Sequence, residues 1–465
     1  MLRRREISAT ELLEAHLHRI DAVNPQLNAI VTLVPDVARE MAQHADDVLT
    51  AGGAIPLLTG LPVTHKDLHE TEGIRTTFGS PLYADFVPDR TTLIVERMQA
   101  AGAVTVGKTN TPQHGAGSQT FNEVFGTTLN PWNTDLTPGG SSGGAAVAVA
   151  TGMSALADGS DYGASLRNPA SFTNSVGFRP SPGRIPSWPT TDAWWTHSVQ
   201  GPIARTVEDI SLFMAAVAGP DPRVPISIDT PGSDFAIPLA QDWKGVPIAW
   251  SEDLGGLPIE PEVTVALAPA LGVLEDIGFD VRRATPDFTG AEDAFQTWRG
   301  YYYVKQFGDD VLRHPDAYKD SIKWNVEHGR SLTAEDLGTA AATRTRLRDR
   351  VLRFLDEHRF LAIPTSAVIP FPITTEYPTD IDGVPMDNYT SWFASCYYIS
   401  VLELPAISIP GGFTESGLPV GLQIVGRHHA DIDVLRAAFA FQQATEHWKR
   451  KPTTDYGPRT TEQPG

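Results

Sequence analysis

The chain has 465 residues, and its 36 lysines and arginines against 56 aspartates and glutamates give a net charge of −20. This balance argues against a nucleic-acid partner, which is held through phosphate contacts and needs a basic surface. The sequence also lacks the run of about 20 apolar residues that a membrane-spanning helix needs, and it shows no signal-peptide pattern. We therefore expect a cytoplasmic protein with neither a nucleic-acid nor a membrane partner.

Helix-type and strand-type segments alternate along the chain. A first helix begins at a capping box on Ser8 and is expected to end at Asn24-Pro25. The spacing of apolar residues predicts further helices and strands, and Gly and Pro residues mark their ends. Helices are expected at 35–50, 91–101, 145–157, 263–277, 333–358 and 432–445, and strands at 60–64, 103–107, 360–364, 406–410 and 418–425.

This alternation predicts an α/β fold. We expect one large domain over residues 1–465, with a mixed, mostly parallel central sheet covered by helices on both faces. Neither an internal repeat nor a convincing linker divides the chain.

The cysteine and histidine content argues against a metal site. The single cysteine, Cys396, excludes an internal disulfide and any site built from several cysteines. Its small and aromatic neighbours are typical of a buried thiol. His65 and His69 stand four residues apart, but Lys66 occupies the position where the zinc-binding helix motif needs a glutamate. The sequence therefore predicts no metal and no cofactor.

The densest glycine cluster, residues 137–144, reads TPGGSSGG. Glycines let a backbone approach a ligand closely, and a flexible linker is the weaker interpretation because an apolar helix follows directly. Two Gly-x-Ser-x-Gly patterns overlap here, as in the nucleophile elbow of α/β-hydrolases. That elbow needs a strand before it, whereas residues 130–138 have the Pro and Asn content of a loop.

Two further features accompany this loop. The turn over residues 159–165 ends at Ser165, and consecutive N–H groups in such a turn can bind an anion, as an oxyanion hole does. Lys66 ends a segment of buried-strand type. Two interpretations of Lys66 stand at this point: an ordinary strand-end lysine paired with Asp67, or a desolvated lysine whose lowered pKa lets it act as a base.

Together these elements resemble the amidase signature family. Its motifs are a strand-end lysine, a Gly-Gly-Ser-Ser-Gly-Gly loop and a serine in an Asp-x-Gly-Gly-Ser-x-Arg turn, which correspond here to Lys66, 139–144 and 161–167. Ser141 and Ser165 are 24 residues apart, as in the family. Similar segments lie at 107–110, 130–132, 201–205 and 417–423. The resemblance implies a motif-bearing catalytic core at about 55–210 and a variable, substrate-facing region at about 220–400.

The resemblance also implies a role for each motif residue. Ser165 would be the nucleophile, Ser141 the proton relay behind a cis Gly140–Ser141 peptide, and Lys66 the neutral base. The oxyanion hole would consist of the N–H groups of Tyr162, Gly163, Ala164 and Ser165, with Ser142, Asp161 and Arg167 as supports.

Three positions depart from the usual family pattern. Ala164 replaces a glycine, Tyr162 a smaller residue, and His65 an apolar one. If residue 164 needs a positive φ, its alanine is strained; otherwise its methyl group only narrows the site.

The expected activity is hydrolysis of a small to medium amide with an aryl or otherwise bulky group, because aromatic residues gather in the variable parts. Ordinary packing is the alternative interpretation of these aromatic residues. They include Trp188, Trp194, Trp195, Trp298, 301–303 and 389–398.

The same triad could open a carbamate (urethane) or an ester. An alternative of another class is the glutaminase subunit of an amidotransferase, which needs a tight protein partner. For the hydrolase we expect a monomer or homodimer that acts on a small-molecule amide or carbamate.

Overall fold

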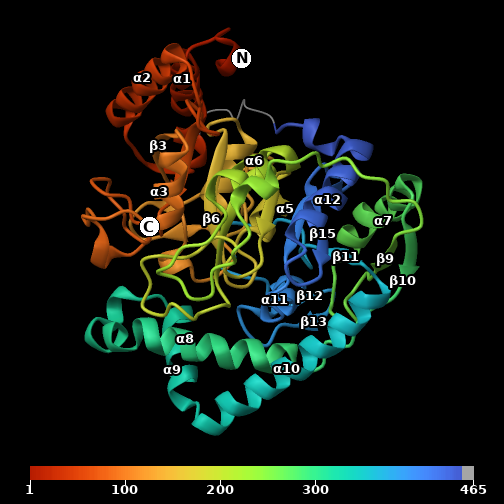
Figure 1. Ribbon diagram of the computed structural model, residues 1–465. Coiled ribbons are helices and arrows are strands. Elements are labelled where there is room, and N and C mark those ends of the chain that lie inside the picture. The colour runs from red at the N-terminus through yellow and green to blue at the C-terminus, as the bar shows by residue number, and fades with distance from the viewer. Residues whose placement is uncertain (453–465) are drawn as a thin grey trace.

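A mixed sheet of eleven strands runs through residues 1–452, the part of the chain that the computed structural model describes (Figure 1). The strand order is β1-β3-β2-β6-β8-β7-β14-β15-β11-β9-β10. The strands are β1 (Ile30–Leu33), β2 (Pro62–Lys66), β3 (Val104–Thr109), β6 (Leu156–Asp161), β7 (Val176–Arg179), β8 (Val199–Ala204), β9 (Pro247–Trp250), β10 (Asp280–Arg283), β11 (Phe360–Pro364), β14 (Ala406–Phe413) and β15 (Pro419–Gly426). Two short hairpins lie apart from it, β4 (Phe121–Asn122) with β5 (Gly126–Thr127), and β12 (Asp380–Ile381) with β13 (Val384–Pro385).

Parallel pairing occurs in two blocks of this sheet. One block is β3-β2-β6 and the other is β11-β9-β10. Within residues 1–452 the other six neighbouring pairs are antiparallel. The α/β class and the mixed sheet are therefore confirmed, and the parallel pairing expected from the sequence is limited to these two blocks.

Helices cover both faces of the sheet. They are α1 (Ala9–Leu27), α2 (Pro35–Ala51), α3 (Leu93–Ala100), α4 (Gly143–Ala150), α5 (Arg167–Thr173), α6 (Val207–Val217), α7 (Pro261–Ile277), α8 (Ala291–Arg313), α9 (Asp320–Ser331), α10 (Ala334–Glu357), α11 (Ala394–Val401) and α12 (Asp431–Thr445). None of the helices in the described part of the chain is long and apolar enough to cross a membrane.

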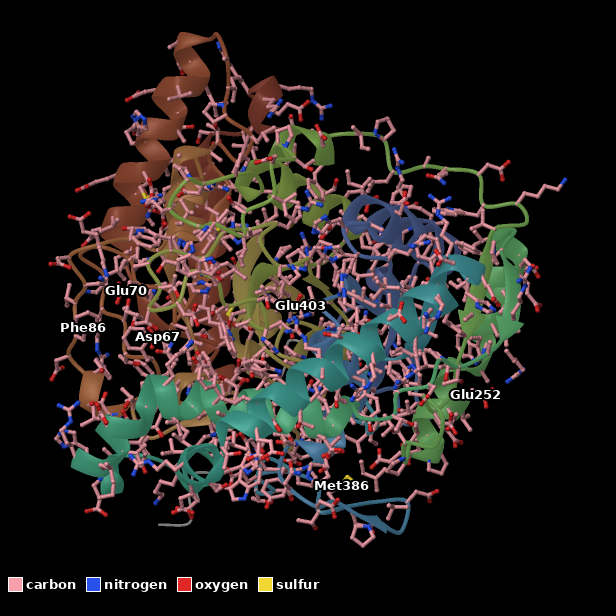
Figure 2. The ribbon with its side chains drawn as sticks, turned by 60° about the horizontal axis from the view of Figure 1, so that its bottom comes forward. Asp67, Glu70, Phe86, Glu252, Met386 and Glu403 are labelled. Atoms are coloured by element: carbon pink, nitrogen blue, oxygen red, sulfur yellow. The ribbon has the colours of Figure 1, made fainter. Side chains whose placement is uncertain are left out.

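Alternation along the strands divides the core into two layers. On β11, Phe360 and Ala362 belong to the core layer that also contains residues of α3, α6, α7 and α12, whereas Leu361 and Ile363 belong to the layer that contains residues of α5, α8, α10 and α11. Helices α1 and α2 cover the other end of the sheet, against β3 and α4. The long helices α8 and α10 form an outer layer at the bottom of Figure 1. Glu403, labelled in Figure 2, forms an ion pair with Arg344 and so attaches α10 to the layer beneath it.

Most of the elements expected from the sequence are present, with shifted ends. The expected stop of the first helix at Asn24-Pro25 is wrong, because α1 continues through Pro25 to Leu27. The expected helix at 145–157 ends early, since α4 stops at Ala150 and β6 begins at Leu156.

Candidate active site

Lys66 and Asp161 end two neighbouring parallel strands. Strands β2 and β6 pair with Val63 opposite Leu156, so their carboxyl ends reach the same edge of the sheet, where ligands bind in open α/β folds. Lys66 is the last residue of β2 and Asp161 the last of β6. Ser165 follows in the turn between β6 and α5. The topology therefore brings the candidate base and the candidate nucleophile to one edge.

The glycine-rich loop adds two serines to this edge. Lys66 Nζ donates hydrogen bonds to Ser141 Oγ at 2.7 Å, to Ser142 Oγ at 2.8 Å and to Ser160 Oγ at 3.1 Å. The Gly140–Ser141 peptide is cis, as the resemblance implies. The Ser142 N–H group donates to the Ser165 carbonyl at 3.2 Å, so the loop is joined to the turn that carries Ser165. Among these residues, Ser160 carries no separate signal in the sequence and is recognised only from its contact with Lys66.

Close packing explains the glycines of this loop. A Cβ atom at Gly143 would overlap Thr120 Oγ1, and one at Gly144 would overlap the backbone of Asn110. Helix α4 therefore begins in direct contact with the chain at 110–120, which a side chain would prevent. Thr120 Oγ1 also donates to the Gly139 carbonyl at 2.8 Å and holds the loop against this segment.

The Lys66 side chain is completely buried. Burial lowers the pKa of Lys66 to about 7, and the carboxylates of Asp161 and Asp158 act in the opposite direction. A lysine with this pKa is substantially neutral near pH 7 and can accept a proton. The interpretation of Lys66 as an ordinary partner of Asp67 is not supported, because Asp67 accepts its hydrogen bonds from Thr77.

Asp161 and Arg167 form a buried ion pair beneath the Ser165 turn. Arg167 Nε and Nη2 donate to the two Asp161 carboxylate oxygens at 3.0 Å each. Arg179 Nη1 adds a third contact at 3.2 Å. Burial alone would raise the pKa of Asp161, but the two guanidinium groups outweigh it and lower that pKa. Arg167 Nη2 also donates to the Gly163 carbonyl at 2.8 Å, so the pair holds the turn directly.

This turn presents backbone N–H groups next to Ser165. The Leu166 N–H group donates to Asp161 Oδ2 at 3.1 Å, whereas none of the hydrogen bonds within residues 1–452 uses the N–H group of Gly163, Ala164 or Ser165. Ala164 is not among the residues with positive φ. Its methyl group is buried in the apolar core below the turn, so alanine causes no backbone strain at this position.

Several of the aromatic residues singled out in the sequence pack around Tyr162. Its ring lies 5.4 Å from that of Tyr302, 5.7 Å from Phe295 and 6.2 Å from Trp195. The Arg299 guanidinium lies over the same ring, 5.3 Å from its centroid. Several aromatic side chains that the sequence suggested as lining for a substrate pocket therefore pack against one another beside the turn.

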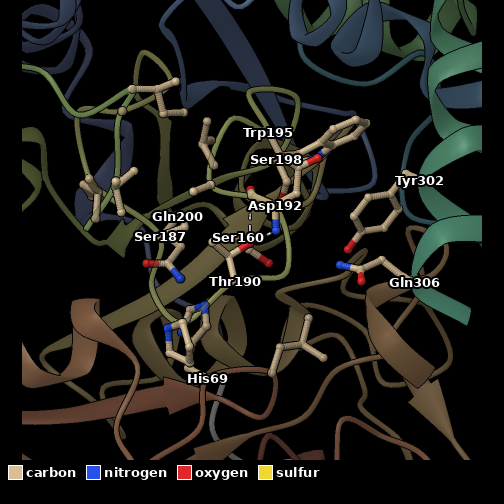
Figure 3. Close-up of a pocket in the computed structure, with 18 of the residues that line it drawn as sticks. His69, Ser160, Ser187, Thr190, Asp192, Trp195, Ser198, Gln200, Tyr302 and Gln306 are labelled. Carbon is tan, nitrogen blue, oxygen red and sulfur yellow. Dashed lines mark hydrogen bonds between the residues drawn. The ribbon is translucent and has the colours of Figure 1, made fainter. Parts of the chain in front are cut away.

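A polar pocket of about 210 Å³ opens beside Ser160 (Figure 3). His69, Asp192 and Gln200 are among its walls, and Gln200 Oε1 is buried without a hydrogen-bond partner. A neighbouring groove of about 550 Å³ shares the wall residue Tyr302 and reaches Glu70 and Phe86, which Figure 2 labels. A polar cavity therefore adjoins Ser160, one of the three hydroxyl partners of the buried lysine.

The sequence predicts a buried thiol at Cys396. Cys396 is completely buried, and burial raises the pKa of its thiol to about 12, as a packed structural cysteine requires. Among the described residues no group of three His, Cys, Asp or Glu side chains is arranged to hold a metal ion.

A family model described as Amidase matches residues 11–435. The chain belongs to the amidase signature family. It is 34% identical to an acylamidase from Rhodococcus erythropolis, over 97% of this chain and 94% of that one. It is 33% identical to a glutamyl-tRNA(Gln) amidotransferase subunit from Moorella thermoacetica, over 97% and 96% of the two chains.

Solved structures agree with this assignment. A bacterial aryl acylamidase of the amidase signature family superimposes with a TM-score of 0.89 and 28% identity over 96% of each chain. The corresponding amidotransferase subunit from Thermotoga maritima gives 0.72 and 26% over 94% and 95%. This amidase is therefore a hydrolase of carbon–nitrogen bonds other than peptide bonds.

Proposed function

We propose that this amidase cleaves a small to medium, aryl or otherwise bulky amide through an acyl-enzyme on Ser165, with Ser141 as the proton relay and Lys66 as the base. One observation carries the proposal. The Nζ atom of a completely buried lysine lies 2.7 Å from Ser141 Oγ, in the loop that is bonded to the Ser165 turn.

These contacts support the following reaction. Neutral Lys66 takes the proton of Ser141 while Ser141 takes that of Ser165, and Ser165 Oγ attacks the carbonyl carbon. N–H groups of residues 162–165 stabilise the oxyanion; loss of one such donor costs about 3 kcal/mol in other enzymes. The proton returns through Ser141 to the leaving nitrogen as the C–N bond breaks. Water then attacks the acyl-enzyme by the same route, and the acid is released.

The relatives support an amide with a bulky group. The protein from Rhodococcus erythropolis is an acylamidase, and the structural neighbour with the TM-score of 0.89 is an aryl acylamidase. The aromatic cluster around Tyr162 lies next to the turn and is consistent with an aryl group. Carbamates and esters place a carbonyl in the same position and are the alternative substrates for the same triad.

The glutaminase alternative has support from sequence, because glutamyl-tRNA(Gln) amidotransferase subunits are among the relatives. The fold favours the hydrolase, since the aryl acylamidase superimposes better than the amidotransferase subunit does, with TM-scores of 0.89 and 0.72.

We infer that the chain acts as a cytoplasmic monomer or homodimer. We also infer that residues 55–210 are its catalytic core and that residues 220–400 face the substrate.

A substrate panel tests the proposal. p-Nitroacetanilide, a p-nitrophenyl carbamate, a p-nitrophenyl ester and glutamine are compared by release of the leaving group, with the Ser165→Ala variant as the blank. Anilide turnover by the isolated chain is expected. Turnover of glutamine alone, together with capture of a stoichiometric partner in size-exclusion chromatography, would identify the chain as a glutaminase component instead of the hydrolase.

A further inference from the structure

A buried carboxylate lies directly behind Lys66. Asp158 belongs to β6 and follows Ala157, which pairs with Thr64 of β2. Asp158, His65 and Lys66 are all 0% exposed. Burying a carboxylate costs free energy unless hydrogen bonds or charges compensate it, so its partners reveal what it does.

Three donors converge on Asp158. Oδ1 accepts the backbone N–H of Lys66 at 2.8 Å and Nδ1–H of His69 at 2.6 Å. Oδ2 accepts Nδ1–H of His65 at 2.5 Å. On its other side, His65 Nε2 lies 3.0 Å from Thr105 Oγ1, which fixes the orientation of that ring. The carboxylate thus binds the backbone of Lys66 itself and is held by two imidazoles.

The Asp158 carboxylate is ionised, and its negative charge acts on Lys66. Burial raises the pKa of Asp158, but the two histidines more than compensate and hold it below its usual range, so the group stays ionised. Burial lowers the pKa of His69, which keeps that imidazole neutral near pH 7. Asp161, the other carboxylate near the lysine, raises the Lys66 pKa more than Asp158 does, but it is itself paired with two guanidinium groups.

The remaining charged groups around the cluster lie on β3 and on the turn after β2. Lys108 donates to the His69 carbonyl, and burial lowers the Lys108 pKa to about 8. Asp67 is buried and acts on Lys108, and Glu70 acts on it less strongly. These groups surround the cluster, and among the charged side chains of the described residues Asp158 is the one that accepts a hydrogen bond from the Lys66 N–H group.

We propose that Asp158 is a positioning residue for Lys66: its carboxylate fixes the strand end from which the lysine reaches Ser141 and contributes a negative charge that acts on the amine, while His65 and His69 hold that carboxylate. The inference rests on the proposed role of Lys66 as the base. The charge opposes the effect of burial and keeps the amine basic enough to take the Ser141 proton.

The test uses the full chain and phenylmethylsulfonyl fluoride, which needs no knowledge of the substrate. Ser165 Oγ attacks sulfur, the S–F bond breaks, fluoride leaves, and the serine proton passes to the lysine. The inactivation rate therefore follows the neutral fraction of Lys66, and mass spectrometry locates the modified residue. If Ser165 of the wild type is not modified, the proposed function itself fails, independently of Asp158.

Asp158→Asn removes the negative charge. The pH at which the inactivation rate reaches half of its maximum (the midpoint) should therefore fall by about one pH unit, and the maximal rate at high pH (the plateau) should be lower than that of the wild type. Thr64→Val is the matched control. It removes a buried hydrogen bond to Ser154 from the same strand without touching Lys66 and should keep the wild-type midpoint. An unchanged midpoint in Asp158→Asn would overturn the role.

A second variant covers the case in which Asp158→Asn does not fold. Asp158→Glu keeps the charge but moves the carboxylate away from the Lys66 N–H group. Its midpoint should stay with the wild type while its plateau rate falls several-fold. A wild-type plateau would show that the position of the carboxylate does not matter, and a midpoint shift would show that its charge does not set the lysine; either result overturns the proposal.

Discussion

Arg167 contacts both carboxylate oxygens of Asp161 at 3.0 Å, and both side chains are completely buried. The same guanidinium bonds the Gly163 carbonyl, Gln423 Oε1 and Ser400 Oγ. One side chain thus joins β6, the Ser165 turn, β15 and α11. A planar fork with several donors can make these contacts at once, whereas an ammonium group cannot.

Arg167→Lys should therefore lower the free energy of unfolding by about 3 kcal/mol, because it leaves a buried carboxylate incompletely paired. Urea unfolding measures this change. The control is Arg353→Lys in α10, whose ion pair with Asp349 is exposed on both sides; its effect should stay within about 0.5 kcal/mol. Equal effects in the two variants would contradict a structural role for the buried pair.

Ser165→Ala removes the proposed nucleophile without disturbing the turn. Because the residue's carbonyl, which accepts the Ser142 N–H bond, is unchanged, the melting temperature should stay close to that of the wild type. Turnover should fall by at least about 10³-fold, as in other serine hydrolases. Active-site titration with an acylating substrate gives the check, and an undiminished acyl-enzyme burst would refute the assignment.

The pH dependence follows from the burial of Lys66. Its pKa of about 7 means that the lysine is protonated below pH 7 and cannot accept the Ser141 proton. The value of kcat/KM should therefore rise about tenfold per pH unit up to pH 7 and level off above it. Lys66→Arg, which stays protonated throughout, should be inactive at every pH. An optimum on the acid side would count against the neutral base.

Local signals explain why much of the site could be predicted from the sequence. Lys66 ends an apolar strand, and the glycine-rich run at 139–144 is visible in the sequence itself, although the contacts that require its glycines come from distant segments such as Asn110 and Thr120. The cluster behind Lys66 could not be predicted this way. His65 and His69 look like an isolated pair in the sequence, and their partner Asp158 lies about 90 residues later, brought in by the pairing of β2 with β6.

The same distinction holds for the sheet. The βαβ unit from β2 to β3 follows from chain order, because a helix separates two strands of a parallel pair. The antiparallel middle also contains strands that are far apart in sequence, such as β7 and β14, where Phe178 lies opposite Ile407. Apolar runs do not encode which distant strand they pair with, so the direction of these strands could not be derived from the sequence.

Ala164→Gly tests whether the methyl group in the turn affects catalysis. Ala164 has no positive φ and its side chain is buried, so glycine should lower stability by about 1 kcal/mol through lost burial and added unfolded-state entropy. The value of kcat/KM should change less than about threefold, since the N–H group stays in place. Thermal unfolding and kinetics are measured together, and a large gain in kcat would show that the methyl group obstructs the oxyanion site.

Gly144→Ala tests the contact at the start of α4. The new Cβ atom would overlap the backbone of Asn110 and the Ala29 carbonyl, and neither can move without shifting β1 or the end of β3. The helix start and Ser141 should be displaced, and because about 1 Å of misplacement can cost about 10²-fold, turnover should fall at least tenfold. Gly272→Ala in α7 is the control. Nothing lies within 4 Å of its added methyl group, so it should keep full activity and gain up to about 1 kcal/mol of stability. Wild-type turnover in Gly144→Ala would mean that the serine loop tolerates a shift of the helix that follows it.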